Sequence, residues 1–409
     1  MAVTVTNKPQ LYTPVGNPVI WKVSTDVDNF LYFKVSILDG DGNTILNTLI
    51  YPTPDFPTGG VINLSRVLDN YVRWDIYNNL MVYPAAKSIL GYTLSIAEVY
   101  LSSGVVTEGT PVSTSLQYVW DGLINRLSFA NYSQDTYILK TGKVINFLTG
   151  KPSTTYLNEK GAEYLYFLNN GDVTTLVVKI DAYGSGGSST PYTYDISAFS
   201  AYKMLMLNIS PDILQSILGF DISTCTYFTI KLVDGDGADL SETRTYLYKK
   251  LECYLEPVNI LFANSLGGID TYQFVNSDIT VAASRTSIKR SLDTAISELN
   301  IMDEVISSYP TESFTLNTRE LSDEETMWLQ ELLLSKQVFF KQNSDTLVPL
   351  QLADTSISLT KKRYVTGLNT KQFTFKLSDG FTSDLLMNDI HIVIPAILGA
   401  NGDFYVRNA

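Results

Sequence analysis

Short runs of β-branched, aromatic and aliphatic residues alternate with turn residues along most of this sequence. Such runs, separated by Gly, Asn, Asp and Ser, are typical of antiparallel strands joined by tight turns. Tyr is also abundant, with 26 copies among 409 residues, and Tyr suits the half-buried surface of a sheet. The sequence therefore predicts a mainly β fold. The clearest strand candidates are residues 31–38, 92–101, 176–180, 227–233, 373–377 and 391–395.

One segment, "SDEETMWLQELLLSK" at 322–336, has a strong helical pattern. Ser322 and Glu325 have the spacing of a capping box, and the acidic residues after Ser322 suit the positive end of the helix dipole. Trp328 and Leu332 lie four residues apart, so they fall on one face. The segment predicts an amphipathic helix.

Weaker helix signals occur at three other places. At 210–219, Ser210 suits the N-cap, a proline follows at the first helical position and Gly219 suits the C-terminal end. A short helix is also expected after Ser65. The stretch 291–306 is compatible with either a helix or a strand.

An internal repeat is visible in the first part of the chain. The pair Lys8-Pro9 recurs as Lys151-Pro152, a shift of 143 residues, and the same shift aligns the strand candidate 32–37 with 175–180. Two "DGDG" tracts, at 39–42 and 234–237, match each other over a much shorter stretch. The longer correspondence indicates two related β domains.

We therefore predict two tandem, related β-sandwich-like domains at 1–125 and 126–255. A β-rich C-terminal domain at 256–409, carrying the helix 322–336, follows them. We expect this third domain to be an α+β layer or a helix-decorated sandwich. Its strand candidates are residues 338–341, 347–352, 356–359 and 372–377.

The DGDG tracts raise the question of calcium, because Asp in alternate positions is a feature of EF-hand loops. An EF-hand also needs Gly at position 6 and Glu at position 12 of the loop. Both tracts lack these residues, whereas Asp-Gly is a strong hairpin signal. We predict plain turns, and a calcium site of another type stays a minor alternative. The template fails at Thr44, Ile50, Ala238, Asp239 and Thr245.

Other catalytic or metal-binding patterns are weak. The single histidine, His391, lies in the alternating run "IHIVI", which favours a strand residue over a member of a catalytic triad. Cys225 and Cys253 give no zinc pattern. We expect these two cysteines to be separate buried thiols, and a disulfide between them stays an alternative. With 42 acidic residues, a glycosidase-like carboxylate pair is a further alternative, although no pair stands out. We predict no enzyme, no cofactor and no metal.

Charge and hydropathy limit the partners. The net charge of −13 argues against a nucleic-acid groove and against docking on anionic lipid. No run approaches the 18 apolar residues of a membrane span, and the first eight residues lack the pattern of a secretory signal. We therefore expect synthesis in a cytoplasm, no membrane and no nucleic acid.

Aromatic residues occur in many strand candidates. Alternation along a strand turns half of them inward, so we interpret most as sandwich core. A carbohydrate-binding platform on an outward face is the alternative. The residues concerned are Tyr12, Trp21, Tyr32, Phe33, Tyr164, Tyr166, Phe167, Tyr227 and Phe228.

The segment "EPVNILFANSLGGIDTYQF" at 256–274 resembles structural virion proteins of phages that infect Bacteroidetes, including crAss-like phages. The downstream stretch 316–359 is similar to the same group, with its Leu-Ser-Asp-x-Glu start, Trp-Leu helix and following strands. The resemblance covers about 256–380 and contains no catalytic residue. The positions that carry it are Asn264, Leu266, Gly267, Gly268, Asp270 and Phe274.

The resemblance implies a non-enzymatic component of a phage virion, in a tail-associated ring, collar or tail tip. Its partners would be other virion proteins and copies of itself in a symmetric oligomer. A receptor- or glycan-binding protein on the particle surface is the alternative function.

Overall fold

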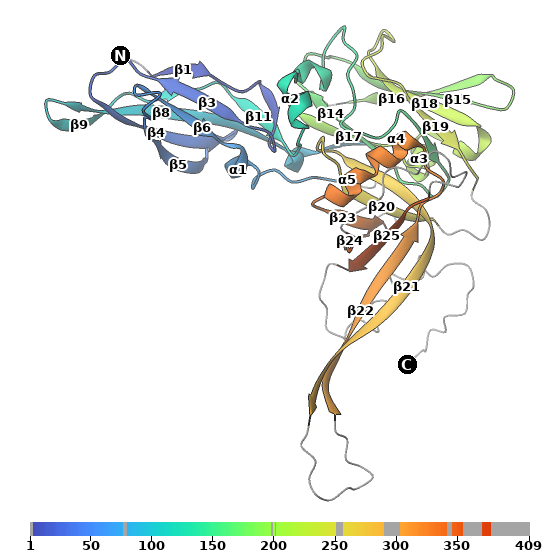
Figure 1. The fold of residues 1–409 in the computed structure, drawn as a ribbon. Coiled ribbons are helices and arrows are strands. Elements are labelled where there is room, and N and C mark those ends of the chain that lie inside the picture. The colour runs from blue at the N-terminus through green and yellow to red at the C-terminus, as the bar shows by residue number, and fades with distance from the viewer. Residues whose placement is uncertain are drawn as a thin grey trace, which may run out of the picture. The chain divides into compact units, whose positions relative to one another are not determined.

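We describe the fold from a computed structural model of the chain. The structure describes residues 3–76, 80–197, 199–200, 202–250, 257–289, 303–341, 346–354 and 370–377. Sheets with few helices make up the fold, so the prediction of a mainly β chain is confirmed (Figure 1). His391, Cys253 and the strand candidates 356–359 and 391–395 lie outside the described residues.

The chain forms two compact units. Unit 1 contains residues 1–156, 163–248 and 263–270, and unit 2 contains residues 157–162, 249–262 and 271–409. Both predicted sandwich domains contribute to unit 1, and most of the predicted third domain belongs to unit 2. The domain boundaries at 125/126 and 255/256 stay predictions.

The first half of unit 1 contains two sheets and one short helix. The smaller sheet has the order β1 (Thr4–Asn7), β3 (Ile20–Ser24), β6 (Gly59–Asn63). The larger has the order β2 (Tyr12–Pro14), β11 (Gln117–Trp120), β8 (Ile89–Ser102), β4 (Phe30–Asp39), β5 (Thr44–Ile50), with β9 (Val105–Glu108) and β10 (Val112–Ser113) also on β8. The helix is α1 (Ser65–Leu68), and a 3-10 turn covers Ala86–Ser88.

The second half of unit 1 also contains two sheets. One has the order β12 (Ile138–Leu139), β14 (Tyr164–Asn169), β17 (Met204–Asn208), β7 (Val82–Pro84). The other has the order β13 (Thr154–Leu157), β19 (Arg244–Tyr248), β18 (Tyr227–Val233), β15 (Leu176–Tyr183), β16 (Ser189–Ile196). The helices are α2 (Arg126–Ala130) and α3 (Pro211–Leu218), with 3-10 turns at Gln134–Thr136 and Ile222–Thr224.

The larger sheets of the two halves have the same strand order. Reading from the edge, β5-β4-β8-β11-β2 corresponds to β16-β15-β18-β19-β13. The 143-residue shift predicted from Lys8-Pro9 places β4 on β15 and β5 on β16 within a few residues. The topology therefore agrees with a duplication. It also shows an exchange that the sequence did not indicate, because β7 of the first half completes a sheet of the second half beside β17.

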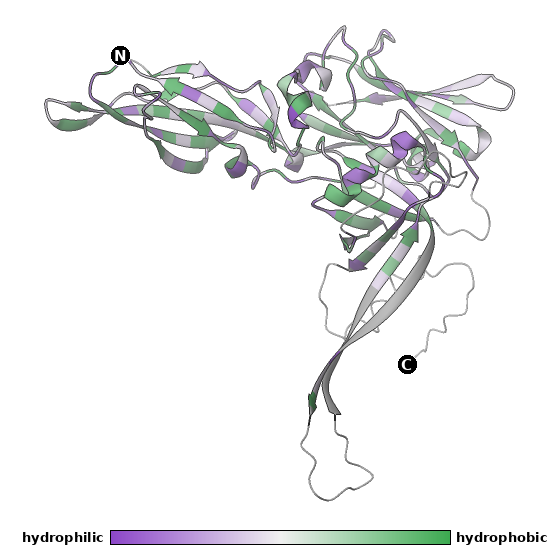
Figure 2. Cartoon of the chain, in the orientation of Figure 1, coloured by the Kyte–Doolittle hydropathy of each residue, from purple (hydrophilic) through white to green (hydrophobic). Residues whose placement is uncertain are grey.

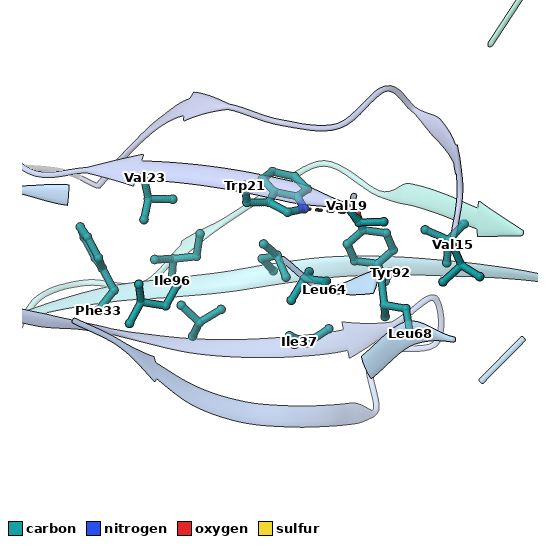
Figure 3. Close-up of a cluster of buried hydrophobic side chains, with 14 of the residues drawn as sticks. Val15, Val19, Trp21, Val23, Phe33, Ile37, Leu64, Leu68, Tyr92 and Ile96 are labelled. Atoms are coloured by element: carbon teal, nitrogen blue, oxygen red, sulfur yellow. Dashed lines mark hydrogen bonds between the residues drawn. The ribbon is translucent and has the colours of Figure 1, made fainter. Parts of the chain in front are cut away.

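The core of the first sandwich lies between its two sheets (Figure 3). Trp21 of β3 and Tyr92 of β8 are almost fully buried and meet edge to face. The Trp21 Nε1–H donates to the Tyr92 hydroxyl at 3.1 Å. Strands such as β4 and β15 alternate between buried and more exposed residues, as expected for sheets with one buried face (Figure 2). Strands β14 and β17 are instead buried at every position.

Unit 2 is a closed barrel rather than the predicted sandwich or α+β layer. Alternating strands fit a sandwich or a barrel equally well, and closure depends on β20 pairing with β23, which no local pattern encodes. The barrel order is β20 (Val258–Ala263), β21 (Ile269–Lys289), β22 (Asp303–Asn317), β25 (Gln372–Leu377), β24 (Leu347–Leu352), β23 (Val338–Lys341).

The predicted helix 322–336 exists but is divided into α4 (Asp323–Trp328) and α5 (Gln330–Leu334). The capping box is complete, since the Ser322 hydroxyl accepts from the Glu325 N–H at 3.0 Å and the Glu325 carboxylate accepts from the Ser322 N–H at 2.9 Å. Trp328 and Leu332 are buried with barrel residues, so this helix pair covers the barrel core.

The prediction at 210–219 is correct for the helix and for the position of its N-cap, but the Ser210 side chain makes no capping bond. Helix α3 covers Pro211–Leu218 and is followed by the C-cap Gly219, which has a left-handed φ of 65°. The Ser210 hydroxyl accepts instead from the Glu163 N–H at 3.1 Å. The Ser210 hydroxyl bonds to a neighbouring segment and makes no capping bond to its own helix, and the sequence gives no sign of that contact.

The short helix predicted after Ser65 is present as α1. In the ambiguous stretch, residues 303–306 belong to strand β22, and residues 291–302 are outside the described residues. Within the residues that the structure describes, no helix has the length and apolar character to cross a membrane.

Candidate functional site

The first DGDG tract forms a turn that uses its own carboxylate. Asp39 Oδ1 accepts from the N–H groups of Asp41 at 3.0 Å and Asn43 at 2.7 Å, while Oδ2 accepts from the Asn43 side chain at 3.0 Å. The Asn43 side chain, and then its backbone N–H, lower the pKa of Asp39 below its usual value of 3.8. The turn closes the hairpin between β4 and β5.

The second tract repeats this geometry. Asp234 Oδ1 accepts from the N–H groups of Asp236 at 3.0 Å and Ala238 at 2.8 Å. Gly237 has a φ of 85°, close to the 87° of Gly42 in the first tract. The prediction of one turn chemistry used twice is confirmed. In the part of the chain that the structure describes, no group of three or more candidate ligands could hold a metal ion.

Charged groups are brought together in the interior of the second sandwich. Lys151 Nζ lies 2.5 Å from Glu163 Oε2, and both side chains are less than 10% exposed, at 8% and 3%. The Tyr246 hydroxyl donates to Glu163 Oε1 at 3.1 Å. Arg244 donates from one guanidinium nitrogen to the carbonyls of Lys151 at 3.0 Å and Pro152 at 2.8 Å. We call Lys151, Glu163, Arg244 and Tyr246 the buried polar cluster.

The groups of the buried polar cluster are those expected of a hydrogen-bond network with a structural role. Burial, followed by the neighbouring Glu163 carboxylate, raises the pKa of Tyr246 well above 10, so the phenol stays protonated and remains a donor. Glu163 therefore has a partner at each of its carboxylate oxygens. Buried charges need such compensation, because an unpaired charge in the interior is very costly. The cluster thus connects three segments. Glu163 directly precedes β14, Arg244 and Tyr246 belong to β19, and Lys151 lies before β13.

The sequence did not single out this cluster. The Lys8-Pro9 echo marked Lys151 only as part of a repeat, and Glu163, Arg244 and Tyr246 lie 12, 93 and 95 residues from it. A charged residue directly before the apolar run "YLYFL" is the one local sign that Glu163 becomes buried. Its partner cannot be identified from that sign.

Five of the six residues that carry the virion resemblance lie in a tight loop at 263–270, a segment of unit 1, and the sixth, Phe274, is buried in the barrel core of unit 2. We call residues 264–270 the NSLGGID loop. Asn264 Oδ1 accepts from the N–H groups of Leu266 at 3.0 Å and Gly268 at 2.9 Å. Asn264 Nδ2 donates to the Leu148 carbonyl and to Asp270 Oδ1, both at 2.9 Å. The buried Asn264 amide thus uses both its donors and its acceptor.

The NSLGGID loop also bonds to the end of strand β11. Trp120 Nε1–H donates to the Leu266 carbonyl at 2.9 Å, and the Leu123 N–H donates to the Ser265 carbonyl at 2.6 Å. Gly267 has a φ of 92°, and a Cβ there would lie 2.1 Å from the Asp121 carbonyl oxygen. Only glycine fits this position.

These contacts explain the motif without any ligand. Asn264 shapes the loop, Gly267 admits the neighbouring backbone and Asp270 accepts from Thr149 Oγ1 at 2.7 Å. Every one of these groups points to another part of unit 1. The motif therefore has a structural role within this unit.

Most of the aromatic residues considered as a binding platform belong to the core. Tyr32 and Tyr227 are the exceptions, since both are half-buried. Tyr227 stacks on Tyr183 at 4.5 Å between ring centroids, so one face of each ring is covered. The buried ones are Tyr12, Trp21, Phe33, Tyr164, Tyr166, Phe167 and Phe228.

Cys225 is a free, buried thiol whose Sγ–H donates to the Ile222 carbonyl at 3.2 Å. Burial raises its pKa to about 11. A thiol in this state is a poor nucleophile.

A long hairpin extends from the barrel of unit 2 (Figure 1). Strands β21 and β22 pair from Val275↔Asn317 to Lys289↔Asp303, but β25 pairs only with Ser313–Asn317 of β22. The six-residue strand β20 reaches only the start of β21. Residues 281–289 and 303–312, which we call the arm, therefore pair only with each other among the described strands.

The arm is about 30 Å long, at roughly 3.3 Å per residue. Both of its outer edges carry backbone N–H and C=O groups that no described strand bonds. Where side-chain exposure is defined, at residues 285–288, all four residues are exposed. The arm is the longest stretch of open strand edge in the described part of the chain.

Comparison with known proteins adds no family to this picture. No protein-family model matches the chain, and no curated protein matches it significantly. The function must be inferred from the fold and the sites themselves.

Proposed function

We propose that this chain is a non-enzymatic structural component of a phage virion, a tail-associated ring, collar or tail-tip adaptor that assembles as a symmetric oligomer. The observation that carries the proposal is the arm. A two-stranded ribbon is marginally stable in water by itself. Its open edges are stabilised when another strand adds to them, as in many protein assemblies.

The proposal assigns a part to each unit. The sandwiches of unit 1 and the barrel of unit 2 each provide surfaces for neighbouring proteins. The arm is the connecting element and binds a neighbouring protein in the particle. The resemblance of 256–274 and 316–359 to virion proteins supports a particle over other large assemblies. A receptor- or glycan-binding role stays the alternative.

A protein inventory of purified particles tests the proposal. We expect mass spectrometry of particles from the phage that encodes this chain to detect it at a stoichiometric ratio to the portal or tail proteins. A phage replication protein expressed at the same time is the control and should be absent. Particles that are infectious and contain none of this chain would refute a structural role.

The alternative makes a different prediction. A glycan-binding protein would bind host polysaccharide as an isolated chain, whereas an adaptor would bind only virion proteins. Binding to a panel of host capsular polysaccharides, with the stacked Tyr183 and Tyr227 changed to Ala as the control, separates the two. Specific binding that disappears in that variant would favour the alternative.

A further inference from the structure

The two sandwiches end in matching edge strands, β5 and β16, that differ in protection. Strand β16 carries the exposed Pro191 and the exposed Asp195. Proline removes a backbone donor and a charge is costly to bury, so both discourage another strand from pairing there. Strand β16 therefore has the features of an edge strand that does not pair with a strand of another chain.

Strand β5 has neither feature. Its sequence, "TILNTLI", contains no proline and no charged residue. Leu46 and Leu49 are 37% and 45% exposed. In the described part of the chain, β4 is the one strand that pairs with β5, so the other side of β5 is open. A neutral, β-branched and apolar edge of this kind is a template for strand addition.

The arm shows the same asymmetry between its two strands. Strand β22 carries Pro310, opposite Ala283 of β21. Proline in a sheet is tolerated where its missing N–H faces away from the pairing strand, so the outer edge of β22 lacks a donor there. Residues 281–289 of β21 contain no proline. The β21 side of the arm is therefore the edge that can accept another strand.

We propose that residues 281–289 of one copy of this chain add as a strand to β5 of a second copy. Both strands have one open edge, and the nine residues 281–289 are long enough to cover the seven residues of β5. The inference rests on the proposed function, because it names the partner of the arm within the assembly.

Charge determines the direction of the added strand. The turn before β5 contains Asp39 and Asp41, and Asp39 favours its ionised form. Of the two basic residues of the 281–289 strand, Arg285 lies at the centre and Lys289 is the last residue, opposite Asp303 of β22. An antiparallel arrangement brings Lys289 next to the acidic turn, whereas a parallel one places Lys289 at the opposite end of β5. The added strand therefore runs antiparallel to β5.

The two surfaces are different, so the contact is heterologous. Each copy offers one arm and one β5 edge, and each can contact two neighbours. Such contacts generate a closed ring when the rotation per copy closes, and a filament when it does not. The apolar, uncharged sequence of β5 is then a functional interface and not an unprotected edge.

Three variants test the contact by light scattering and sedimentation of the purified full chain. Leu49→Glu adds a charge to the open edge of β5, opposite Lys34 of β4. Thr193→Glu is the matched control on β16, opposite Lys179 of β15. In both variants the new carboxylate is placed opposite a lysine on the adjacent strand, and urea denaturation checks that each variant is folded. The third variant shortens the arm by joining Thr280 and Ser313, which are paired, through Asn-Gly.

We expect the wild-type chain and Thr193→Glu to form the same oligomer. Leu49→Glu and the shortened arm should raise the dissociation constant at least about tenfold, which corresponds to about 1.4 kcal/mol. A photo-crosslinking residue at position 49 should form adducts with the peptide that contains residues 281–289 of another copy.

The inference fails if the wild-type chain stays monomeric at a protein concentration 100-fold above that of the urea denaturation experiments. It also fails if Leu49→Glu forms the same oligomer as the wild type. Crosslinks from position 49 to β5 of the second copy would show that two β5 edges pair with each other, which contradicts pairing between β5 and the arm. These outcomes leave the proposed function intact, because a chain found in particles but lacking this contact is still a virion protein. Absence from particles overturns the proposed function alone.

Discussion

The two sandwiches of unit 1 have the same order of strands in their larger sheets but different interiors. In the first, the Trp21 indole bonds to the Tyr92 hydroxyl, and the buried Glu98 carboxylate accepts from the Thr25 hydroxyl at 2.9 Å. In the second, Glu163 accepts from Lys151 and Tyr246. A strand order survives such a change because backbone pairing defines it, while the inner side chains need only fill space and satisfy their polar atoms.

The comparison predicts that one carboxylate matters most. Glu163→Ala leaves the Lys151 ammonium buried without its carboxylate, so we expect a loss of about 3–5 kcal/mol in the free energy of unfolding. Urea denaturation followed by tyrosine and tryptophan fluorescence measures it. The double variant Lys151→Met, Glu163→Leu removes both charges and should recover most of the loss. A single variant as stable as the wild type would contradict a structural ion pair.

The second prediction concerns the NSLGGID loop, which contacts segments from both sandwiches. Gly267→Ala requires a positive φ and places a Cβ against the Asp121 carbonyl, so we expect a cost of about 2–4 kcal/mol. Gly237→Ala is the matched control, with a φ of 85° and no atom within 4 Å of the added Cβ. It should cost about 1–2 kcal/mol. Equal costs in the two variants would mean that the close approach at 267 is unimportant.

The third prediction concerns the hydrogen bond between Trp21 and Tyr92 in the core of the first sandwich. Tyr92→Phe removes the acceptor of the buried Trp21 N–H, so we expect a loss of about 1–2 kcal/mol. The same denaturation assay applies. If the loss reached that of Glu163→Ala, the neutral Trp21–Tyr92 hydrogen bond would be as important as the buried ion pair of the second sandwich.

The smallest effect belongs to the matching turns. Asp39→Ala removes three hydrogen bonds of the first turn and should lower Tm slightly at pH 7. Because the pKa of Asp39 is below 3.8 in the folded chain, its contribution is present above pH 3.8 and is lost as the pH falls through the lowered value. The Tm difference from wild type should therefore shrink in acid. A difference that grows in acid would show that the carboxylate is not the stabilising form.

Local signals in the sequence were sufficient for individual elements. The bounds predicted for β23, β24 and β25 agree with the structure, and the capping box at Ser322 forms as expected. These elements depend on periodicity, capping and turn chemistry within a few residues. The DGDG turns belong to the same class.

Long-range features could not be predicted in this way. Closure of the barrel depends on β20 pairing with β23, about 80 residues later in the chain. The crossing of β7 to β17 and the bond between Glu163 and Tyr246 join segments with no shared pattern. The motif at 264–270 was visible as a resemblance, but its role depends on Trp120, which lies 146 residues earlier.

The separation between Trp120 and the NSLGGID loop has a consequence for synthesis of the chain. At about 5–20 residues per second, the ribosome needs roughly 7–30 s to make the intervening 146 residues. During that interval the end of β11 and the Leu148 carbonyl have not yet formed their hydrogen bonds to residues of the NSLGGID loop. The nascent first and second sandwiches can form their own sheets, but the contacts that lock them to residues 264–270 form last. Emergence of residues 264–270 from the ribosome, rather than the folding of either sandwich, is then the event after which unit 1 reaches its final structure.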